Sequence, residues 1–300
     1  DWNPCGTLEH RTKPFRGDLP DSGPAADWSR PASIEQRQLA GLPAGSSAVW
    51  HPHAAWVRPA ALVQAWLDAP GIQWRGNAPV ACIEPVDGGG WCLRSAEGTA
   101  LAHAPLVVLA AALGSRELSG DRLWLHAVRG QVSWALHQGN EALAPFAVNG
   151  HGHLLPDVPV PGGRAWMSGS TYGREDDATD ERPADHLDNL ERLRSLLPRR
   201  ADALAEAFLQ ERVRGWAGVR CASADRRPLV GALAPGLWVS TAMGSRGLTF
   251  AALCAELMAA RLHGEPLPLA RSLASALDVG RMVGTRAPSP RPSPTFGRRG

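Results

Sequence analysis

The run Leu106-Val-Val-Leu-Ala-Ala-Ala112 constrains the fold more than any other segment, because every residue in it is apolar. A strand with one face in water alternates apolar and polar residues, whereas a strand of a parallel sheet is covered on both faces and is apolar throughout. We therefore expect Leu106–Ala111 to be a buried strand of a parallel α/β sheet. Ligands in such sheets lie at the carboxyl ends of strands, here at Leu113-Gly-Ser115. Taken alone, the run is better explained by a plain core strand.

A second strand also leads into a turn that suits a ligand. The short apolar strand Leu237–Thr241 precedes Gly244-Ser-Arg-Gly247, and a helix of small apolar residues, Thr249–Leu262, follows. Glycines before a helix let a ligand approach the backbone closely, and the helix N-terminus offers free N–H groups with a partial positive charge. An ordinary strand-to-helix turn is the alternative, because glycine pairs are common.

Arg220 is the candidate for binding an anionic substrate. It lies among small residues in Trp216-Ala-Gly-Val-Arg220, within a glycine- and arginine-rich stretch, Gly215–Gly231, that we expect to be a loop region. A guanidinium binds a carboxylate through two parallel hydrogen bonds. A salt bridge to an acidic side chain of the protein is the alternative, and composition does not separate the two.

Shorter elements are predicted before the first apolar strand. Pro59–Asp68 is typical of a helix with proline in its first turn. Ile72–Arg75, Val80–Val86 and Trp91–Arg94 have strand patterns, and the turn Asp87–Gly90 predicts a hairpin between the last two.

The pattern changes between the two α/β segments. From Val128 to Thr171 short strands alternate with Gly and Pro turns, which predicts an antiparallel sheet. Two helices follow, at about residues 185–197 and 201–210. The sequence therefore predicts a mixed α/β fold in which one domain is interrupted by another.

The predicted division has five parts. Residues 41–118 and 217–270 would form the α/β domain, and residues 119–216 the antiparallel domain between its halves. Residues 1–40 show no strand periodicity and are expected to be irregular. Residues 271–300 form a tail, which we expect to be disordered from about residue 284 because Pro, Ser and Arg dominate it.

Composition narrows the class of protein. Hydrophobic residues make up 44% of the chain, which is enough for a sizeable core. The formal net charge is +2 and the basic residues are almost all arginine, with Lys13 the single lysine. Because Ala, Gly and Pro are abundant too, we attribute the arginines to a coding preference and do not take them as a sign of nucleic-acid binding.

Cysteine and histidine patterns give little support for a metal or disulfide site. The five cysteines are odd in number and none are spaced as CxxC, which favours buried thiols in a reducing compartment. The pairs His51/His53 and His151/His153 lack a third ligand at a suitable spacing. No apolar run could span a bilayer and no secretion signal is present, so we expect a cytoplasmic protein without membrane contact.

The order of the motifs resembles that of D-amino-acid-oxidase and glycine-oxidase-like flavoenzymes. The segments that carry this resemblance are Arg129-Gly-Gln-Val132, Gly169-Ser-Thr171, Trp216–Arg220, Asp225-Arg-Arg-Pro-Leu-Val-Gly231 and Gly244–Gly247. Within that group the chain most resembles the C-terminal oxidoreductase module of the MnmC family of bifunctional tRNA-modifying enzymes. The segments that say so are Gly218–Asp225, Ala242–Leu248 and Leu253–Pro268.

The resemblance implies an FAD-dependent oxidoreductase with a Rossmann-like domain and an antiparallel substrate domain. In this family the carboxymethyl group is removed from 5-carboxymethylaminomethyl-(2-thio)uridine at the wobble position of tRNA. FAD takes a hydride from the carbon between nitrogen and carboxylate, which gives an imine. Hydrolysis of this imine releases glyoxylate, and an aminomethyl group remains on the base. A methyltransferase module of the full enzyme then methylates that amine. The implied partners are therefore tRNA and a methyltransferase module that this chain does not contain.

The resemblance also implies roles for particular residues. Arg220 would hold the substrate carboxylate, with Arg246 beside it or near the flavin. The backbone at Gly244, Ser245, Gly247 and Leu248 would stabilise negative charge on the reduced ring. Val80 would lie by the adenine, and Ala112 and Gly114 by the pyrophosphate.

The sequence departs from the family in one large respect. The GxGxxG fingerprint, the acidic residue for the adenosine ribose and the methyltransferase module do not occur in it, and residues 9–38 differ from the family pattern. The resemblance thus implies an N-terminally truncated chain with an incomplete Rossmann-like domain that binds FAD weakly or not at all. Two other interpretations stay open: an oxidase of free glycine, sarcosine or a D-amino acid, and a non-catalytic fragment.

Overall fold

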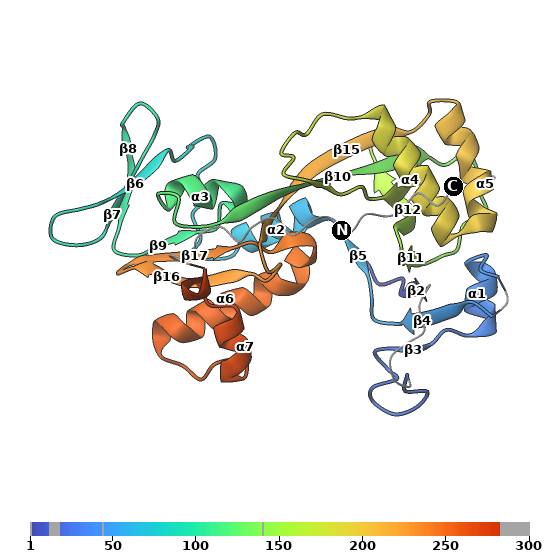
Figure 1. The fold of residues 1–300 in the computed structure, drawn as a ribbon, viewed down its shortest axis with the longest axis horizontal. Helices are drawn as coiled ribbons and strands as arrows, with labels where there is room; N and C mark the ends of the chain where they lie inside the picture. Colours follow the sequence, from blue (N-terminus) through green and yellow to red (C-terminus); the bar gives the residue numbers. More distant parts are fainter. Residues whose placement is uncertain (1, 12–18, 44, 140, 283–300) are drawn as a thin grey trace. The chain divides into compact units, whose positions relative to one another are not determined.

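The computed structural model describes residues 2–11, 19–43, 45–139 and 141–282 (Figure 1). The chain forms two compact units that are interleaved in sequence. Unit 1 takes Asp1–Trp74 and Arg129–Val219, and unit 2 takes Arg75–Val128 and Arg220–Gly300. Residues 41–74, which the sequence pattern assigns to the α/β domain, belong to unit 1.

Unit 1 is built on a sheet with the strand order β14-β10-β13-β12-β11-β2-β4-β3, and β15 also pairs with β10. The pairs β10–β13, β12–β13 and β2–β4 are antiparallel, while β11 and β2 are parallel. This confirms the antiparallel sheet predicted between Val128 and Thr171. The strands are β2 (Thr7–Arg11), β3 (Arg30–Pro31), β4 (Ser47–His51), β10 (Leu125–Leu136), β11 (Ala147–Asn149), β12 (His153–Val160), β13 (Gly163–Gly169), β14 (Gly173–Arg174) and β15 (Arg214–Ser223).

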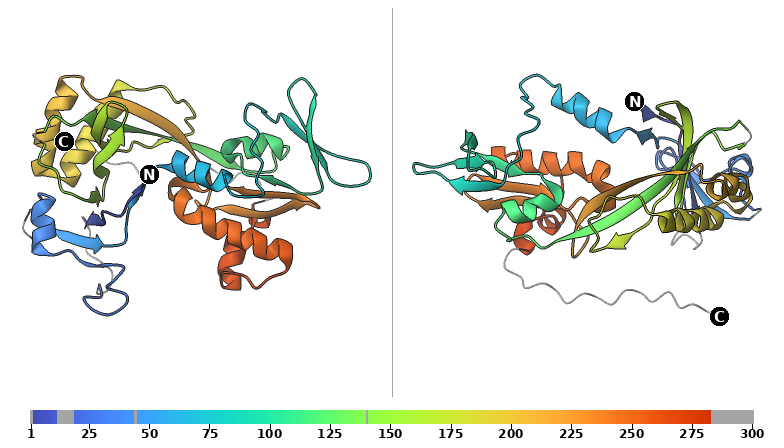
Figure 2. Two further views of the ribbon diagram at one scale, coloured as in Figure 1. Left: turned by 180° about the vertical axis from the view of Figure 1, so that it is seen from behind. Right: turned by 90° about the horizontal axis from the view of Figure 1, so that it is seen from above.

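Two helices pack on this sheet and close the core of unit 1. They are α4 (Pro183–Leu196) and α5 (Pro198–Leu209), and each has proline in its first turn, where the missing N–H costs no hydrogen bond. Leu190, Leu193 and Leu196 recur at helical spacing and are buried with Trp166 of β13. Burying one such leucine contributes roughly 1.5–3 kcal/mol. Figure 2 shows both helices from two further directions.

The remaining elements of unit 1 are short. β1 (Trp2–Asn3) pairs with β5 (Trp56–Val57), and α2 (Pro59–Leu67) follows. Helix α1 (Ile34–Leu39) starts with a capping box, in which Ser33 and Gln36 bond each other's backbone N–H groups. Helix α2 confirms the helix predicted at Pro59–Asp68.

Unit 2 contains the α/β layer. Its central sheet has the order β16-β17-β9, in which β17 is parallel to β9 and antiparallel to β16. A second sheet, β6-β7-β8, contains the hairpin predicted at Asp87–Gly90. The elements are β6 (Cys82–Pro85), β7 (Trp91–Arg94), β8 (Ala100–Ala104), β9 (Val107–Leu109), α3 (Ser115–Leu118), β16 (Leu229–Ala234), β17 (Leu237–Thr241), α6 (Gly247–His263) and α7 (Arg271–Ala276).

Three predictions about elements are wrong. Ile72–Arg75 is not a strand, because Ile72 and Trp74 are exposed and pair with no neighbouring strand among the described residues. Gly215–Gly231 is not a loop region but the larger part of β15, a turn, and the first half of β16. The N-terminal segment is not irregular throughout, because β2 lies between β11 and β4.

The apolar strand Leu106–Ala111 is covered on one face only. Val107 and Leu109 are buried, but Val108 is 36% exposed, so the expected burial of both faces is wrong for the described residues. The expected disorder from residue 284 onward lies outside those residues.

No helix in the described part of the chain is long and apolar enough to cross a membrane.

Candidate functional site

The carboxyl ends of two parallel strands meet at one edge of the unit 2 sheet. β9 and β17 are in register, with Leu109 opposite Val239, so the loops after them leave the sheet at the same edge. The Thr241 hydroxyl, at the end of β17, donates a 3.0 Å hydrogen bond to the Ala112 carbonyl in the loop after β9. Two loops that the sequence singles out separately are therefore tied together.

The loop after β9 is fixed by its own hydrogen bonds. Ala112 has a positive φ of 48°, which is uncommon for a residue with a side chain. The Ala111 N–H donates to the hydroxyl of buried Ser115 at 3.1 Å, across the single turn Ala112–Gly114. Such a conformation persists only where the surroundings hold it, which makes this turn a rigid edge of the site.

The loop after β17 is open above Gly244. Gly244 has a φ of 57°, and apart from its chain neighbours no atom of the described residues lies within 4 Å of the position that a Cβ would take. The left-handed conformation favours glycine, and the free space allows another molecule to approach the backbone. Ser245 and Leu248, which follow Gly244 in the chain, are exposed, the latter by 49%.

Helix α6 begins directly at this loop. It runs for 17 residues from Gly247, and the side chain at its N-cap position, Arg246, makes no capping hydrogen bond. The first-turn N–H groups of a helix have no partners within the helix and carry a partial positive charge. This end of α6 therefore suits an anion or an electron-rich ring edge.

The strand that carries Arg220 ends at the same loop. Ala222 of β15 forms an isolated bridge with Met243, and the Cys221 thiol lies 3.7 Å from the Thr241 hydroxyl. Arg220, two residues before Ala222, is half-buried. Arg246 is exposed, lies 4.9 Å from the Phe250 ring and reaches the Arg226 carbonyl at 3.4 Å. The described fold thus brings both arginines' segments to the glycine loop.

Val80 is placed differently from the other predicted site residues. It is half-buried and precedes β6, so it lies outside any strand. The sheet that follows it packs on the same core as β9 and β17, through Ile83 and Leu93. Its predicted place beside an adenine stays a prediction.

Sequence reasoning missed the ion pair that holds the turn between β15 and β16. The Asp225 carboxylate accepts hydrogen bonds from Arg281 at 3.0 and 3.1 Å and from the Ser223 hydroxyl at 2.8 Å. Burial alone would raise the pKa of Asp225, but these bonds outweigh it and lower the pKa to about 2. The turn also contains Arg226, whose carbonyl Arg246 contacts. Asp225 belongs to a motif quoted above, but nothing local marks Arg281 as its partner.

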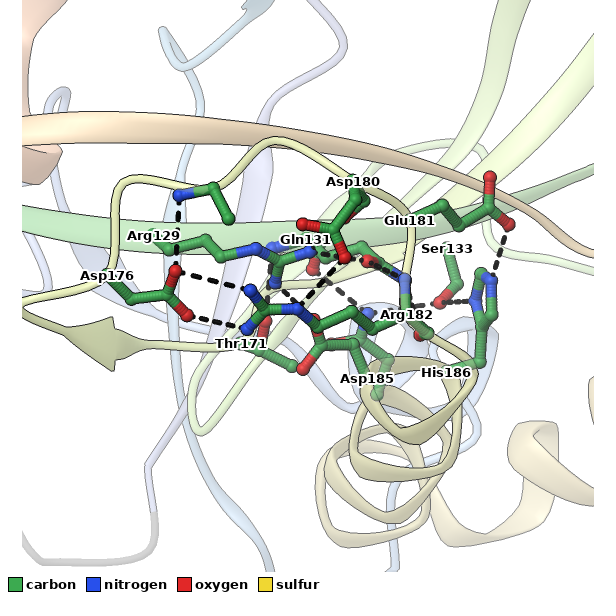
Figure 3. Close-up of polar contacts among 12 residues, drawn as sticks. Arg129, Gln131, Ser133, Thr171, Asp176, Asp180, Glu181, Arg182, Asp185 and His186 are labelled. Atoms are coloured by element: carbon green, nitrogen blue, oxygen red, sulfur yellow. Dashed lines mark hydrogen bonds and ion pairs between the residues drawn. The ribbon is translucent and has the colours of Figure 1, made fainter.

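Unit 1 contains a separate cluster of buried polar side chains (Figure 3). Arg129 of β10 is 2% exposed, and its Nη groups bond the Asp185 carboxylate, the Asp180 carbonyl and the Gln131 side chain. Gln131 accepts from the Arg182 N–H at 2.8 Å and donates to the Arg182 carbonyl at 3.0 Å. These bonds join β10 to the start of α4.

The same cluster includes a row of three hydrogen-bonded side chains, Ser133, His186 and Glu181. Ser133 Oγ lies 2.7 Å from His186 Nδ1, and His186 Nε2 lies 2.8 Å from Glu181 Oε1 (Figure 3). The bond from His186 lowers the pKa of Glu181. This is the geometry of a hydrolytic triad, but Ser133 is fully buried and its oxygen also accepts from Asn189 at 3.0 Å. A nucleophile with no access to substrate stabilises the fold, so we assign the cluster a structural role.

No group of three or more His, Cys, Asp or Glu side chains suited to a metal gathers among the described residues. His51 instead bonds Ser29 at 2.8 Å and Glu9 at 3.3 Å, and the His53 ring packs on Trp28.

The edge loops define the class of protein. Two tied loops at the carboxyl ends of parallel strands, beside an uncapped helix N-terminus, are typical of α/β proteins that bind a nucleotide-like ligand.

Comparison with known proteins narrows this class. The family model described as FAD dependent oxidoreductase matches residues 1–261, and the chain therefore belongs to that family. Relatives include the tRNA 5-methylaminomethyl-2-thiouridine biosynthesis bifunctional protein MnmC of Polaromonas naphthalenivorans, 49% identical over 92% of this chain and 46% of that protein. The protein of the same name from Verminephrobacter eiseniae is 46% identical over 94% of this chain and 51% of its own length. The chain thus spans about half the length of these curated relatives.

Solved structures share the fold. Glycine oxidase from Geobacillus kaustophilus has a TM-score of 0.71 at 18% identity, covering 94% of this chain and 76% of that one. Iminodiacetate oxidase from Chelativorans sp. BNC1 has a TM-score of 0.66 at 19% identity, covering 90% of this chain and 74% of that one. At these identities the likeness concerns the fold, and it confirms the predicted mixed α/β, oxidase-like class.

The edge loops fit the family's cofactor. The free Cβ position at Gly244 lets another molecule approach the backbone, and the first turn of α6 has N–H groups without partners in the helix.

Proposed function

We propose that this chain is the oxidoreductase part of a bifunctional tRNA-modifying enzyme. Its reaction would remove the carboxymethyl group from 5-carboxymethylaminomethyl-(2-thio)uridine at the tRNA wobble position. The names of the relatives support the substrate, and the family match supports FAD chemistry. The observation that carries the proposal is the arrangement at the sheet edge, where the Arg220 strand ends against the open Gly244 loop.

Arg220 has the main binding role in this proposal. Its planar guanidinium would grip the substrate carboxylate through two hydrogen bonds, which fixes the direction of the adjacent C–H bond. Arg246 would add positive charge in the same loop region, because Arg246 is exposed.

The backbone of the two loops would hold the cofactor. Gly244, Ser245, Gly247 and Leu248 would present N–H groups to the flavin, Ala112 and Gly114 would face the pyrophosphate, and Val80 the adenine. Bound FAD would supply the hydride acceptor for oxidising the carbon between nitrogen and carboxylate. Water would then hydrolyse the imine to glyoxylate and an aminomethyl uridine, while the hydride with its two electrons stays on the reduced flavin.

The proposal includes partners beyond the chain. The relatives are called bifunctional and are about twice as long, which supports a methyltransferase module as the second part. A tRNA substrate supports a cytoplasmic location.

Glyoxylate release is the direct test. Protein loaded with FAD should release glyoxylate from tRNA carrying the carboxymethylaminomethyl group and leave the aminomethyl nucleoside, detected by mass spectrometry. Oxidation of free glycine or sarcosine with no effect on tRNA would establish the small-amine alternative. A colourless protein that takes up no flavin would establish the non-catalytic alternative.

A further inference from the structure

Trp216 lies within β15 and yet is 65% exposed. Alternate residues of a strand share a face, so Arg214, Trp216 and Gly218 lie on one side of β15. Arg214 is exposed as well. A large aromatic side chain beside an exposed cation, on the open side of a strand, is a surface that suits an aromatic anion.

The indole of Trp216 lies over Gly218. A Cβ at Gly218 would be 2.6 Å from the Trp216 ring, closer than any side chain tolerates. The missing side chain at Gly218 thus lets the indole lie along the strand with its other face open. A ring held in this way loses little freedom when another ring stacks on it.

Arg214 also lies over a second aromatic ring, that of Trp134. The Arg214 guanidinium lies 5.5 Å from the centre of the Trp134 ring, on β10, the strand that pairs with β15. A pocket of about 290 Å³ lies here, lined in part by Trp134, Leu136, Arg212 and Arg214. One acidic residue, Glu211, is on its rim.

The reverse side of β15 is held in place by the polar cluster. A Cβ at Gly215 would lie 2.6 Å from the Glu181 side chain, and the Gly215 backbone hydrogen-bonds the Glu181 carboxylate. His186 holds that carboxylate from the other side (Figure 3). These contacts fix the strand next to Trp216 against the polar cluster.

We propose that Trp216, with Trp134, Arg212 and Arg214, forms a stacking platform for unpaired bases of the tRNA anticodon loop. The inference rests on the proposed function for its choice of RNA. Proteins recognise single-stranded RNA loops by stacking splayed bases on aromatic and guanidinium planes, and by pairing arginines with phosphates. Arg220, the residue proposed to hold the carboxylate, follows Trp216 by four residues in the same strand.

Binding of an anticodon stem-loop RNA with 2-aminopurine at the wobble position tests the platform. Stacking quenches 2-aminopurine fluorescence, so titration gives both affinity and stacking. Trp216→Ala should weaken binding roughly 5- to 100-fold and abolish the quenching, because base stacking on an aromatic ring has about that effect. Trp216→Phe should keep most of the affinity and most of the quenching. Trp74→Ala, which removes another exposed tryptophan, is the matched control and should change neither.

The cationic rim is tested through salt dependence. Arg214→Gln should lower the slope of log affinity against log salt by roughly 0.7, the change expected for one lost phosphate contact in single-stranded RNA. Arg194→Gln makes the same change of charge at an exposed site on α4 and should leave the slope unaltered.

The outcomes separate this inference from the proposed function. Release of glyoxylate from tRNA by Trp216→Ala with an unchanged KM would overturn the platform and leave the function standing. Failure to release glyoxylate from any tRNA, with RNA affinity still lost in Trp216→Ala, would overturn the function and support the platform. A wild-type dimer that Trp216→Ala turns into a monomer, with RNA affinity unchanged, would assign this face to a second copy of the chain and overturn the platform.

Discussion

The polar cluster of unit 1 and the loop edge of unit 2 both carry arginines, but they hold them differently. Arg129 is buried and bonded through both Nη groups to partners on three different residues. Arg246 is exposed, lies 4.9 Å from the centre of the Phe250 ring and reaches the Arg226 carbonyl at 3.4 Å. A buried, bonded cation stabilises the fold, whereas a loosely held one beside open space is available to a ligand. Substitutions in the polar cluster should therefore lower the free energy of unfolding, whereas substitutions at the loop edge should lower turnover or flavin content.

The largest effect is expected at Arg129. Replacing it with alanine leaves Asp185, whose side chain is mostly buried, without its cation. Breaking a buried ion pair in this way costs about 3–5 kcal/mol of unfolding free energy. Urea denaturation of Arg129→Ala should show this loss.

An exposed ion pair of the same unit provides the control. Arg164 and Asp157 are each about half exposed, so Arg164→Ala should cost less than about 1 kcal/mol. Equal stability losses in the two variants would show that the polar cluster does not hold unit 1 together.

Arg220 should affect turnover and leave folding intact. Lysine there keeps the charge but loses the two-pronged geometry, and alanine loses both. Losing a charged hydrogen-bonded contact costs about 1.5–3 kcal/mol, or roughly ten- to a hundred-fold in kcat/KM for modified tRNA. Glyoxylate release by FAD-loaded protein measures this.

Flavin content and thermal unfolding control for the Arg220 variants. Unchanged kcat/KM in Arg220→Ala would reduce Arg220 to a structural residue. An unfolded variant would point instead to a salt bridge within the protein.

Gly244→Val should lose flavin, because the side chain fills the open space and strains a left-handed backbone. The strain costs about 1–3 kcal/mol. Flavin absorbance per protein, measured after loading with FAD, should fall.

Gly98 is a matched control for this change. It also has a positive φ and open space around its Cβ position, and it lies in the turn between β7 and β8. Gly98→Val should lower stability similarly without lowering flavin content. Normal flavin content in Gly244→Val would contradict the placement of the cofactor.

The sequence predicts those parts of the fold that depend on local pattern. Helix α2, the β6–β7 hairpin and strand β17 follow from proline, glycine and apolar periodicity within a few residues. β15 was not predictable, because its ladder with β10 is formed by residues far away in sequence, and its glycines imitate turn signals. In that strand, glycine is used for close packing against Glu181 and Trp216.

The candidate site also has a part that the sequence predicts and a part that it does not. The glycine loop is visible in the sequence, since it follows an apolar strand and precedes a helix. The bonds that assemble the site are not, because Thr241 and Ala112 are 129 residues apart and Arg281 and Asp225 are 56 apart. The roles of Arg220 and of the cofactor-facing residues stay predictions.

The smallest effect is expected from Asp225 in acid. Its folded pKa of about 2 lies below the ordinary value of 3.8, so the unfolded chain takes up the proton first as the pH falls. The stability that Asp225 contributes is therefore fully present above about pH 4 and is lost as the pH falls to about 2. Because the carboxylate is 35% exposed and screened by solvent, we expect a loss of only about 1 kcal/mol.

Asp225→Asn should remove this part of the acid dependence of unfolding, measured by urea titrations between pH 5 and pH 2. Arg281→Gln should remove the same part, since Arg281 donates both charged hydrogen bonds. The double variant should then differ little from either single one, because the two residues share one interaction. Additive losses in the double variant would show that Arg281 stabilises unit 2 mainly through its bonds to the Arg227, Pro228 and Asp278 carbonyls. The turn beside Arg246 would then be held by those backbone contacts, and Asp225 would not position it.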